Sequence, residues 1–491
     1  PEFQRYKGRV VERGDAMKDE EGAYAVFSEQ GASASRVEAA RFIDAISRMD
    51  GCTGFNIDAI KAFNQIKLPP DCPPLWCALP RHRWPKEWEG KGFRRPVALQ
   101  LYNLYGHPRA GHYWEQFVHK VATEEGWRPF PGWECLYYHP KDCLVMNVYV
   151  DDFKIAGRKD TINVAIDRLR VHMKLDDAVA INSGIYLGMT QRDIPCPPEL
   201  LKEKQDLFDL IMNAAHPTAL PQKQDGDAAF HTAFRSKSTN NEQKTKPPKG
   251  ARRLTAEEVR CWESEMIGHV KASVKRYCDL SRTDIKSLQK VATPNLDDSS
   301  FVESDFTTKG VLSAEACRIV LMALWSARNV RPELLWTVNT LSREVTKWTV
   351  ACDKRLKRLI SYMHWHVDDV QVSFVGDSPE KCGLFLFCDA SFAADAPHSK
   401  STSGSFLALV GPNTFCPITW FVKRQGCVTH SSSEAEIASL DASVRMIGIP
   451  CLQLWEIVCS MFVRFDSRSA SAACVETEIN QYSQDNIYSV Y

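Results

Sequence analysis

The chain has 491 residues, and its 61 Lys and Arg balance 61 Asp and Glu, so the formal net charge is zero. With 44% hydrophobic residues the composition excludes a wholly disordered chain, and zero net charge excludes a protein that grips nucleic acid through bulk charge. At about 100–200 residues per domain, the length predicts roughly two to four domains.

The 17 cysteines form no CxxC pair and no zinc-finger spacing, which indicates reduced thiols in an intracellular protein. No apolar run approaches the roughly 18 residues of a membrane helix, so we expect no contact with a membrane. The opening residues, PEFQRYKGRVV, resemble neither a signal peptide nor an initiator start. We therefore expect the chain to be a piece of something longer.

The periodicity of apolar residues predicts an alternation of blocks along the chain. A helical spacing over 34–49 precedes strand-like segments over 51–190, of which 54–63 and 143–157 are the clearest. Residues 216–252 are rich in Pro, Lys, Gln, Asn and Thr and predict a linker or disordered insert. Residues 313–366 predict helices. Strands return over 381–465, with a helix from about Ser433 and a last strand over 459–466.

Two adjacent aspartates, Asp151 and Asp152, interrupt two apolar runs and predict the turn of a β-hairpin. A solvated turn is the plain alternative for such a pair. Asp58 weakens that alternative, because it lies inside an apolar run where a buried carboxylate is costly unless it is paired or binds a metal. Carboxylates on adjacent strand ends suit hard cations such as Mg²⁺, two of which support phosphoryl transfer.

Five segments together resemble the reverse transcriptase of copia-type LTR retrotransposons. The segment Tyr149-Val150-Asp151-Asp152 resembles the YVDD box of that family, and Asp58 to Phe63 resembles its D-V-K-T-A-F strand. The other matches are Leu104-Tyr105-Gly106 with Trp114 (family L-Y-G-x7-W), Tyr186-Leu187-Gly188 (F-L-G) and Tyr6 to Val11 (Y-K-A-R-L-V). The segments follow the family order.

The resemblance implies an RNA-directed DNA polymerase that extends a DNA primer with dNTPs. It assigns Asp58, Asp151 and Asp152 to two Mg²⁺ ions, with Mn²⁺ as an alternative metal. It places Lys7, Arg9, Phe63, Tyr149 and Arg109 at the incoming nucleotide, with Phe63 under the sugar and Arg109 in place of a family glutamine. Ordinary surface charge is the alternative for Lys7 and Arg9, and core packing is the alternative for Phe63.

Residues 81–95, RHRWPKEWEGKGFRR, interleave basic and aromatic side chains. Lys and Arg hold phosphates and aromatic rings stack on bases, so this segment fits a template-contacting loop of the fingers. A solvated loop with a few aromatic anchors is an equally weighted alternative.

A second carboxylate lies at the end of an apolar strand, at Asp389, where a simple turn residue is the alternative. It is followed by 400–404 (KSTSG), 419–425 (TWFVKRQ) and 431–436 (SSSEAE), in an order that resembles the copia-type ribonuclease H domain. Residues 465–470 resemble the strand end that carries a third carboxylate in that family.

The resemblance implies that Asp389, Glu436 and Asp466 hold two Mg²⁺ ions and cut RNA in RNA–DNA hybrids. Residues 431–436 are also a good helix start with a serine cap, which is the structural alternative for Glu434 and Glu436. Asp485 is a weak candidate for the family's fourth acidic position.

We therefore predict an α+β multidomain chain: reverse-transcriptase fingers and palm (1–200), thumb start and polar insert (201–260), helical thumb or connection (261–375) and a ribonuclease H-like α/β domain (376–491). Expected partners are an RNA template, a DNA primer, their hybrid, dNTPs and other parts of a Pol polyprotein, and dimerisation stays open. The family implies cytoplasmic virus-like particles with nuclear entry of the product. The competing hypothesis is a decayed or domesticated remnant that binds nucleic acid without catalysis.

Overall fold

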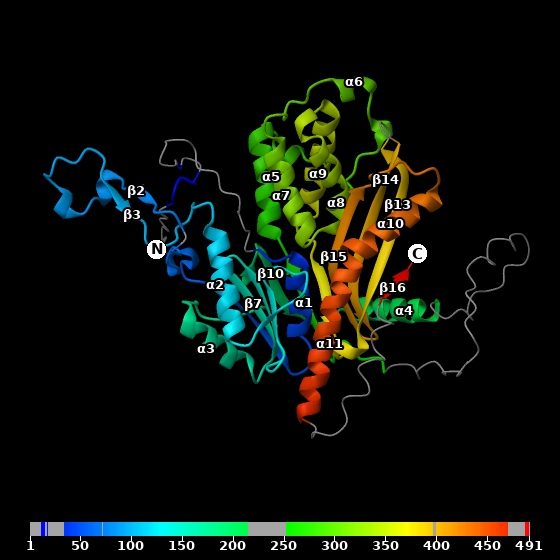
Figure 1. Ribbon diagram of the computed structural model, residues 1–491. Helices are drawn as coiled ribbons and strands as arrows, with labels where there is room; N and C mark the ends of the chain where they lie inside the picture. Colours follow the sequence, from blue (N-terminus) through cyan, green and yellow to red (C-terminus); the bar gives the residue numbers. More distant parts are fainter. Residues whose placement is uncertain are drawn as a thin grey trace, which may run out of the picture. The chain divides into compact units, whose positions relative to one another are not determined.

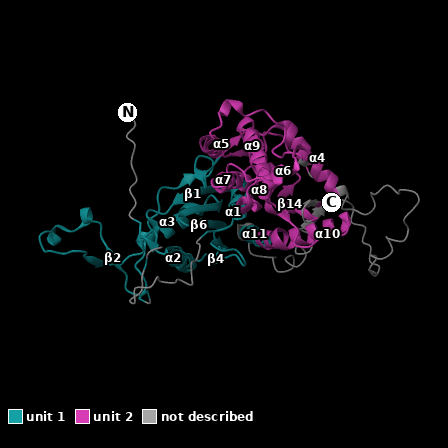
Figure 2. Ribbon diagram, turned by 90° about the horizontal axis from the view of Figure 1, so that it is seen from above, with its two compact units in different colours: residues 1–190, 456–477 teal, residues 191–455, 478–491 magenta. Residues whose placement is uncertain are grey.

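The computed structural model describes residues 11–14, 17, 34–70, 72–214, 252–395, 399–469 and 487–490. It is a mixed α/β arrangement with several sheets (Figure 1). The chain divides into two compact units, residues 1–190 with 456–477 and residues 191–455 with 478–491 (Figure 2). Lys7, Arg9, Asp485 and nearly all of the predicted insert lie outside the described residues.

The first unit is built on a sheet of six strands in the order β4-β5-β6-β7-β1-β8. The strands of this unit are β1 (Cys52–Asp58), β2 (Trp76–Ala78), β3 (Val97–Leu99), β4 (Arg128–Pro129), β5 (Leu136–His139), β6 (Leu144–Tyr149), β7 (Asp152–Arg158), β8 (Val179–Ala180) and β9 (Ile185–Tyr186). Its helices are α1 (Val37–Ser47), α2 (Ala110–Glu124) and α3 (Ile162–His172). Strand β10 (Met189–Ile194) crosses the unit boundary.

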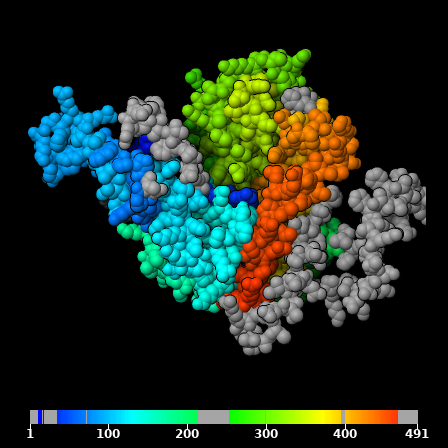
Figure 3. All heavy atoms as spheres, viewed as in Figure 1, coloured from blue at the N-terminus to red at the C-terminus, as the bar shows by residue number. Residues whose placement is uncertain are grey.

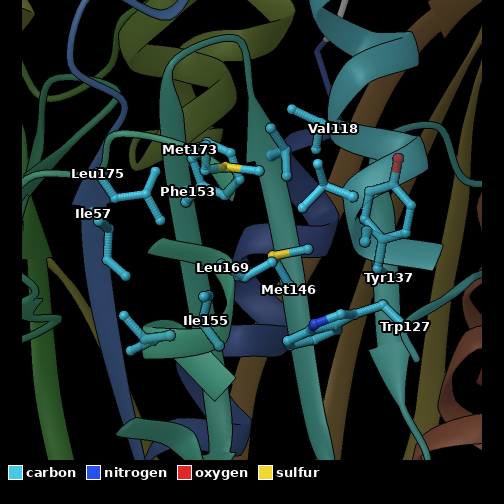
Figure 4. Packing of buried hydrophobic residues seen from close by; sticks show 14 of the residues in the cluster. Ile57, Val118, Trp127, Tyr137, Met146, Phe153, Ile155, Leu169, Met173 and Leu175 are labelled. Atoms are coloured by element: carbon cyan, nitrogen blue, oxygen red, sulfur yellow. The ribbon is translucent and has the colours of Figure 1, made fainter. Parts of the chain in front are cut away.

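One face of this sheet forms the main core of the unit. Alternate residues along the strands, such as Ile57 on β1 and Phe153 and Ile155 on β7, point to the same side because side chains alternate along a strand. They pack with α2 and α3 through residues such as Val118 and Leu169 (Figure 4). The predicted strands at 54–63 and 143–157 therefore lie in the centre of one antiparallel sheet.

Helix α1 packs on β1, β6 and β7. The side chains between α1 and the strands are unusually polar for a buried layer, since Asp44, Asn56, Asn147 and Lys154 are all buried there. Such a layer is stable only if its charges and amides find partners inside it.

The second unit combines helices with a larger sheet. Its helices are α4 (Pro198–Ala214), α5 (Ile267–Ser281), α6 (Glu303–Thr307), α7 (Ala316–Asn329), α8 (Leu335–Arg343), α9 (Val350–Trp365), α10 (Ser432–Ser443) and the first part of α11 (Ile449–Ser469). Its strands are β11 (Arg260–Glu265), β12 (Gln371–Val375), β13 (Gly383–Asp395), β14 (Lys400–Gly411), β15 (Thr414–Arg424) and β16 (Ile487–Val490). The helices predicted over 313–366 correspond to α7, α8 and α9.

Strands β13, β14 and β15 form a continuous antiparallel meander, and β16 pairs with β13 in parallel. Helix α10 packs on β13 and β14. It begins where the serine-rich motif predicted, because the Ser431 side chain accepts a hydrogen bond of 3.1 Å from the backbone N–H of Glu434.

The strand predicted over 459–466 is wrong, since these residues belong to α11. The buried positions of the helical stretch recur every three or four residues, as on the inner face of a packed helix. These positions are Ile447, Cys451, Leu454, Trp455, Val458, Met461 and Phe462. This helical spacing of buried residues continues through 459–466. It therefore favours a helix there over a strand, in which every second residue would be buried.

One helical stretch of the described chain, Ser432–Phe465, is long and apolar enough to cross a membrane by length and composition alone. Its most apolar window has a mean hydropathy of 1.7 and is 44% buried within the structure. This differs from the expectation that no segment reaches that threshold. That expectation requires an uninterrupted apolar run, and Gln453 and Glu456 break the run here. The helix continues through both residues, and its mean hydropathy stays high in spite of them.

Candidate active site

The two adjacent aspartates lie at a tight hairpin turn, as predicted. Tyr149 and Asp152 are paired across β6 and β7, so Val150 and Asp151 form a two-residue connection. Val150 has a φ of 57°, a left-handed conformation that is strained for a β-branched residue. On the other side of β7, Asp152 is directly opposite Asp58 of β1. Strand pairing thus brings all three predicted aspartates to one end of the sheet.

Two hydrogen bonds hold this turn from the core side. The indole N–H of Trp114, on α2, donates to the carbonyl oxygen of Val150. The backbone N–H of Ala59 donates to the carbonyl oxygen of Asp151 over 2.7 Å. Because Trp114 and Ala59 donate hydrogen bonds to both carbonyls of the turn, they hold Val150 in its strained left-handed conformation.

Of the three aspartates, Asp152 has a pKa that is clearly raised by its surroundings. Asp58 is exposed at the end of β1, so the expected burial of that carboxylate does not occur. Asp152 is partly buried, and burial, the charges of Asp151 and Asp58, and a hydrogen bond to the Asp58 carboxyl raise its pKa to about 7. Without a cation, the carboxyl of Asp152 therefore titrates near neutral pH.

These residues are suited to bind a divalent cation. Within the described ranges no three His, Cys, Asp or Glu side chains are already gathered as a metal site. However, strand pairing sets Asp152 directly opposite Asp58, and Asp151 adjoins it in the turn, so the three carboxylates lie at one end of the sheet. A hard cation that prefers carboxylate oxygens would replace the proton and relieve the repulsion.

We expect the Asp152→Asn substitution to stabilise the metal-free chain at alkaline pH. The folded-state pKa of Asp152 is raised above its unfolded value, so the parent loses stability as the pH rises from about 4 to about 7. Allowing for solvent screening, the gain at about pH 8 in a chelator should be about 1–2 kcal/mol. Thermal unfolding at about pH 8 and pH 4 tests this, since the gain should disappear at the lower pH.

The predicted nucleotide contacts occupy different environments. Phe63 follows β1 in a short 3₁₀ turn (Ala62–Gln65), half-buried, with its ring centroid 4.8 Å from that of Tyr105. It therefore packs against the core as well as lying beyond Asp58. Arg109 precedes α2 and lies close enough to Tyr113 to act on the pKa of its hydroxyl, which burial raises and Arg109 lowers. Tyr149 lies at the end of β6, directly before the turn.

The glycine of the Leu104-Tyr105-Gly106 motif has a clear steric reason. Gly106 has a φ of +92°, and a Cβ atom there would lie 2.0 Å from the carbonyl oxygen of Glu12. The backbone N–H of Glu12 donates to the carbonyl oxygen of Tyr105 over 2.7 Å. Only glycine fits this close backbone approach.

The sequence analysis missed a buried ion pair two residues beyond Asp152. Lys154 of β7 is fully buried and pairs with Asp44 of α1, and its ammonium lies 4.6 Å from the ring centroid of Tyr186. The Tyr186 hydroxyl in turn accepts a 3.0 Å hydrogen bond from the Asn147 amide. Desolvation lowers the pKa of Lys154, opposed by Asp44. The sequence signal that could have revealed this ion pair is the lysine inside the apolar run 153–156.

The second group of predicted carboxylates is only partly assembled. A Glu436 carboxylate oxygen accepts a 3.2 Å hydrogen bond from the backbone N–H of Ala390, next to Asp389. Glu434 instead lies exposed at the helix start and accepts from the backbone N–H of His430 over 2.7 Å. Asp389 and Glu436 are thus neighbours, as the choice of Glu436 requires. Asp466 belongs to α11 rather than to a strand end.

Comparisons with known proteins give partial similarities. No family model matches the chain. An uncharacterized mitochondrial protein of Arabidopsis thaliana is 29% identical over 126 residues, which is 25% of this chain and 48% of that protein. The chain thus spans about half the length of this curated relative. A solved structure of the foamy viral protease-reverse transcriptase in complex with an RNA/DNA hybrid is similar over 94% of this chain and 46% of that one, at 9% identity and a TM-score of 0.38.

Proposed function

We propose that the first unit is an RNA-directed DNA polymerase of the copia type, which extends a DNA primer with dNTPs. The observation that carries the proposal is the meeting of Asp58, Asp151 and Asp152 at one end of a single sheet, around a strained turn. Crowded carboxylates at a fixed position suit two-metal phosphoryl transfer. The order of the five matching segments supports the same reading.

In this proposal each residue near the turn has a defined task. Asp58, Asp151 and Asp152 would hold Mg²⁺, which when bound lowers the pKa of a primer 3′-hydroxyl and stabilises the leaving pyrophosphate. Phe63 would support the sugar of the incoming nucleotide from its position beyond β1. The bound carbonyls of Val150 and Asp151 would keep the carboxylates oriented during the reaction.

Incorporation of dTTP on a poly(rA)/oligo(dT) primer-template tests the proposal. We expect Mg²⁺-dependent extension by the full chain and none by the Asp151→Asn/Asp152→Asn double variant. A folded chain that binds the primer-template but extends nothing would favour the decayed remnant.

For the second unit we propose a ribonuclease H-like domain, with Asp389 and Glu436 as two of its metal-binding carboxylates. Binding of the hybrid without cleavage is a second candidate, favoured by the helical position of Asp466, which removes the expected third carboxylate from a strand end. Incubation with an RNA–DNA hybrid whose RNA strand is end-labelled distinguishes cleavage from binding alone. RNA cleavage abolished by Asp389→Asn supports the nuclease, and binding without cleavage supports the second candidate.

We expect Trp114 to act as a positioning residue for the metal-binding turn. Trp114→Phe leaves the partly buried carbonyl of Val150 without its donor, at a cost of about 1–3 kcal/mol, so Mn²⁺ binding should weaken by roughly tenfold. Titration of Mn²⁺ followed by electron paramagnetic resonance measures this.

Trp127→Phe is the matched control. Trp127 is equally buried in the same core, and its indole N–H has no hydrogen-bond partner among the described residues. It should lower stability by a similar loss of packing but leave the Mn²⁺ affinity unchanged. Equal loss of affinity in both variants would contradict a specific role for Trp114.

A further inference from the structure

We propose that a hollow beside Asp389, on the sheet of the second unit, binds a planar guanidinium-type cation and thereby competes with the metal for that carboxylate. The competition rests on the proposed ribonuclease H-like function of this unit, whereas the binding site itself does not. Three observations carry the proposal: a gap in a row of side chains on the sheet, aromatic rings beside the gap, and the negative charge at its rim.

Two neighbouring rows of paired residues cross β13, β14 and β15. The first row is aromatic and consists of Phe387, Phe406 and Trp420. The second row lies two residues away along each strand and consists of Asp389, Gly404 and Val422. Residues that are paired across strands, or two apart along a strand, point to the same face of the sheet. Because the middle member of the second row is a glycine, a gap remains at its centre.

The gap belongs to a hollow of about 250 Å³. Both rows line the hollow, and Pro332 and Leu335, at the beginning of α8, line it from the helical side. In the space-filling view the helical region of this unit, drawn in green to yellow, lies directly beside its orange strands (Figure 3). The volume is below the roughly 300–1,000 Å³ of pockets for drug-sized ligands, so the hollow has room for one ring or one side chain.

Neither the backbone nor the packing at Gly404 requires a glycine. A Cβ atom there would have the carbonyl oxygen of Asp389 as its nearest neighbour, at 3.8 Å, which is an ordinary contact. The φ of Gly404 also lies outside the left-handed region. A glycine weakens the interior of a strand, and it often marks a position where a ligand approaches the backbone closely. The gap therefore fits a binding site better than a need of the strand.

The aromatic row gives the hollow a wall that attracts cations. The rings of Phe406 and Trp420 are stacked, with centroids 6.0 Å apart, and the ring of Phe387 lies 6.2 Å from that of Phe406. All three rings are half-buried, so part of each remains available to a ligand. Trp420 is held in place by its indole N–H, which donates to the carbonyl oxygen of Ala327 over 2.9 Å. The faces of such rings attract cations, and a flat guanidinium stacks on them.

The charge at the rim selects a cation over an anion. Asp389 is exposed and lines the hollow, and none of the described residues that line it carries a positive charge. Within the described ranges no Lys, Arg or His side chain forms an ion pair with the Asp389 carboxylate. A nucleotide or another anionic ring would be repelled by this carboxylate. A guanidinium suits both features, because it stacks on aromatic faces and donates two parallel hydrogen bonds to a carboxylate.

A cation in the hollow would weaken metal binding at Asp389. Two cations that share one carboxylate each lower the affinity of the other, and by linkage the factor is the same in both directions. The hollow would then be an inhibitory site of the proposed ribonuclease H-like domain. A free guanidinium compound and an arginine side chain of another protein offer the same chemistry, and the test distinguishes these two sources.

The test measures binding of 4-fluorobenzamidine, a flat aromatic amidinium, to the full chain by fluorine magnetic resonance of the ligand. 4-Fluorobenzamide has nearly the same shape without the charge and serves as the control ligand. The variants are Gly404→Val, which fills the gap, and Asp389→Asn, which removes the charge. The matched control variant is Gly426→Val, since Gly426 follows β15 outside the hollow and a Cβ atom there also has room. Arginine amide and a short arginine peptide are compared as competitors of the amidinium.

We expect the parent and Gly426→Val to bind the amidinium equally, and on the order of tenfold more tightly than the neutral amide. Asp389→Asn should remove the preference for the charged ligand. Gly404→Val should abolish binding of both ligands without lowering the melting temperature, so that unfolding does not explain the loss. Mn²⁺ should displace the amidinium from the parent. Both sources support the guanidinium class: equal competition by arginine amide and peptide indicates a free compound, and stronger competition by the peptide indicates a protein partner.

Two results would overturn the proposed site. One is equal binding of the amidinium and the neutral amide by the parent, and the other is unchanged amidinium binding by Gly404→Val. Failure of the ribonuclease proposal is distinguishable, because amidinium binding would still depend on Asp389 and Gly404 while the RNA of a hybrid stayed intact. If the RNA is cut but Mn²⁺ and the amidinium bind independently, the proposed competition is wrong.

Discussion

Replacing Asp152 by Asn should lower Mg²⁺-dependent dNTP incorporation by on the order of 10³-fold or more. Metal ions supply several kcal/mol of charge stabilisation in phosphoryl transfer, and each 1.36 kcal/mol corresponds to a tenfold change in rate. Asp152 is central in the cluster, since it is opposite Asp58 and adjoins Asp151. Asparagine preserves the shape but removes the negative charge. Single-turnover extension at saturating dNTP measures the effect on the chemical step.

The Asp160→Asn variant is the matched control. Asp160 follows the other end of β7 and, among the described residues, forms a surface ion pair with Arg158 at 3.6 Å, so its loss should leave extension unchanged. The Asp152 variant should also be the more stable of the two in a chelator. An active Asp152→Asn variant, or one that is both inactive and unfolded, would contradict a purely catalytic loss.

The second large effect is on stability and concerns Asp44. Asp44→Asn should lower the free energy of unfolding of the first unit by about 3–5 kcal/mol, because it leaves the buried Lys154 ammonium without its carboxylate. Arg41 and Arg48 already oppose the charge of Lys154, and the Tyr186 ring beside the ammonium carries no charge that could replace the carboxylate. Hydrogen exchange of the β7 amides measures the local opening free energy in this chain of two units.

The partner substitutions should behave unequally. Lys154→Met should cost less than Asp44→Asn, since Arg41 and Arg48 remain near Asp44. The double variant Asp44→Leu/Lys154→Met should recover most of the loss, as an apolar pair of similar volume usually does. If the two single variants lower the free energy of unfolding equally, then Arg41 and Arg48 do not compensate the charge of an unpaired Asp44.

The Asp44→Asn loss should also depend on pH. The pKa of Lys154 is already lowered by desolvation, and loss of Asp44 lowers it further. A lysine whose folded pKa lies below its unfolded value gains stability as the pH rises between the two. The loss should therefore shrink at alkaline pH, and a loss that is constant with pH would exclude a buried ammonium as its cause.

The sequence was informative wherever a local pattern fixes the structure. Two apolar runs around Asp151 and Asp152 predict a hairpin, because alternation and turn residues act over a few neighbours. The serine cap before Glu434 predicts the start of α10 for the same reason. At 459–466 the local pattern misled, because apolar residues in a short run fit a strand and a helix alike.

The sequence by itself thus determined the apolar runs of β1, β6 and β7 and the turn between β6 and β7, and it singled out Asp58, Asp151 and Asp152 as candidate carboxylates of the first unit. Only the tertiary structure decided that β1 pairs with β7 in the register that puts Asp58 opposite Asp152, and that Glu436 rather than Glu434 lies beside Asp389. It also decided that Lys154 is buried against Asp44. Pairing register and the burial of a charge depend on partners far away in the chain, and local periodicity carries no information about them.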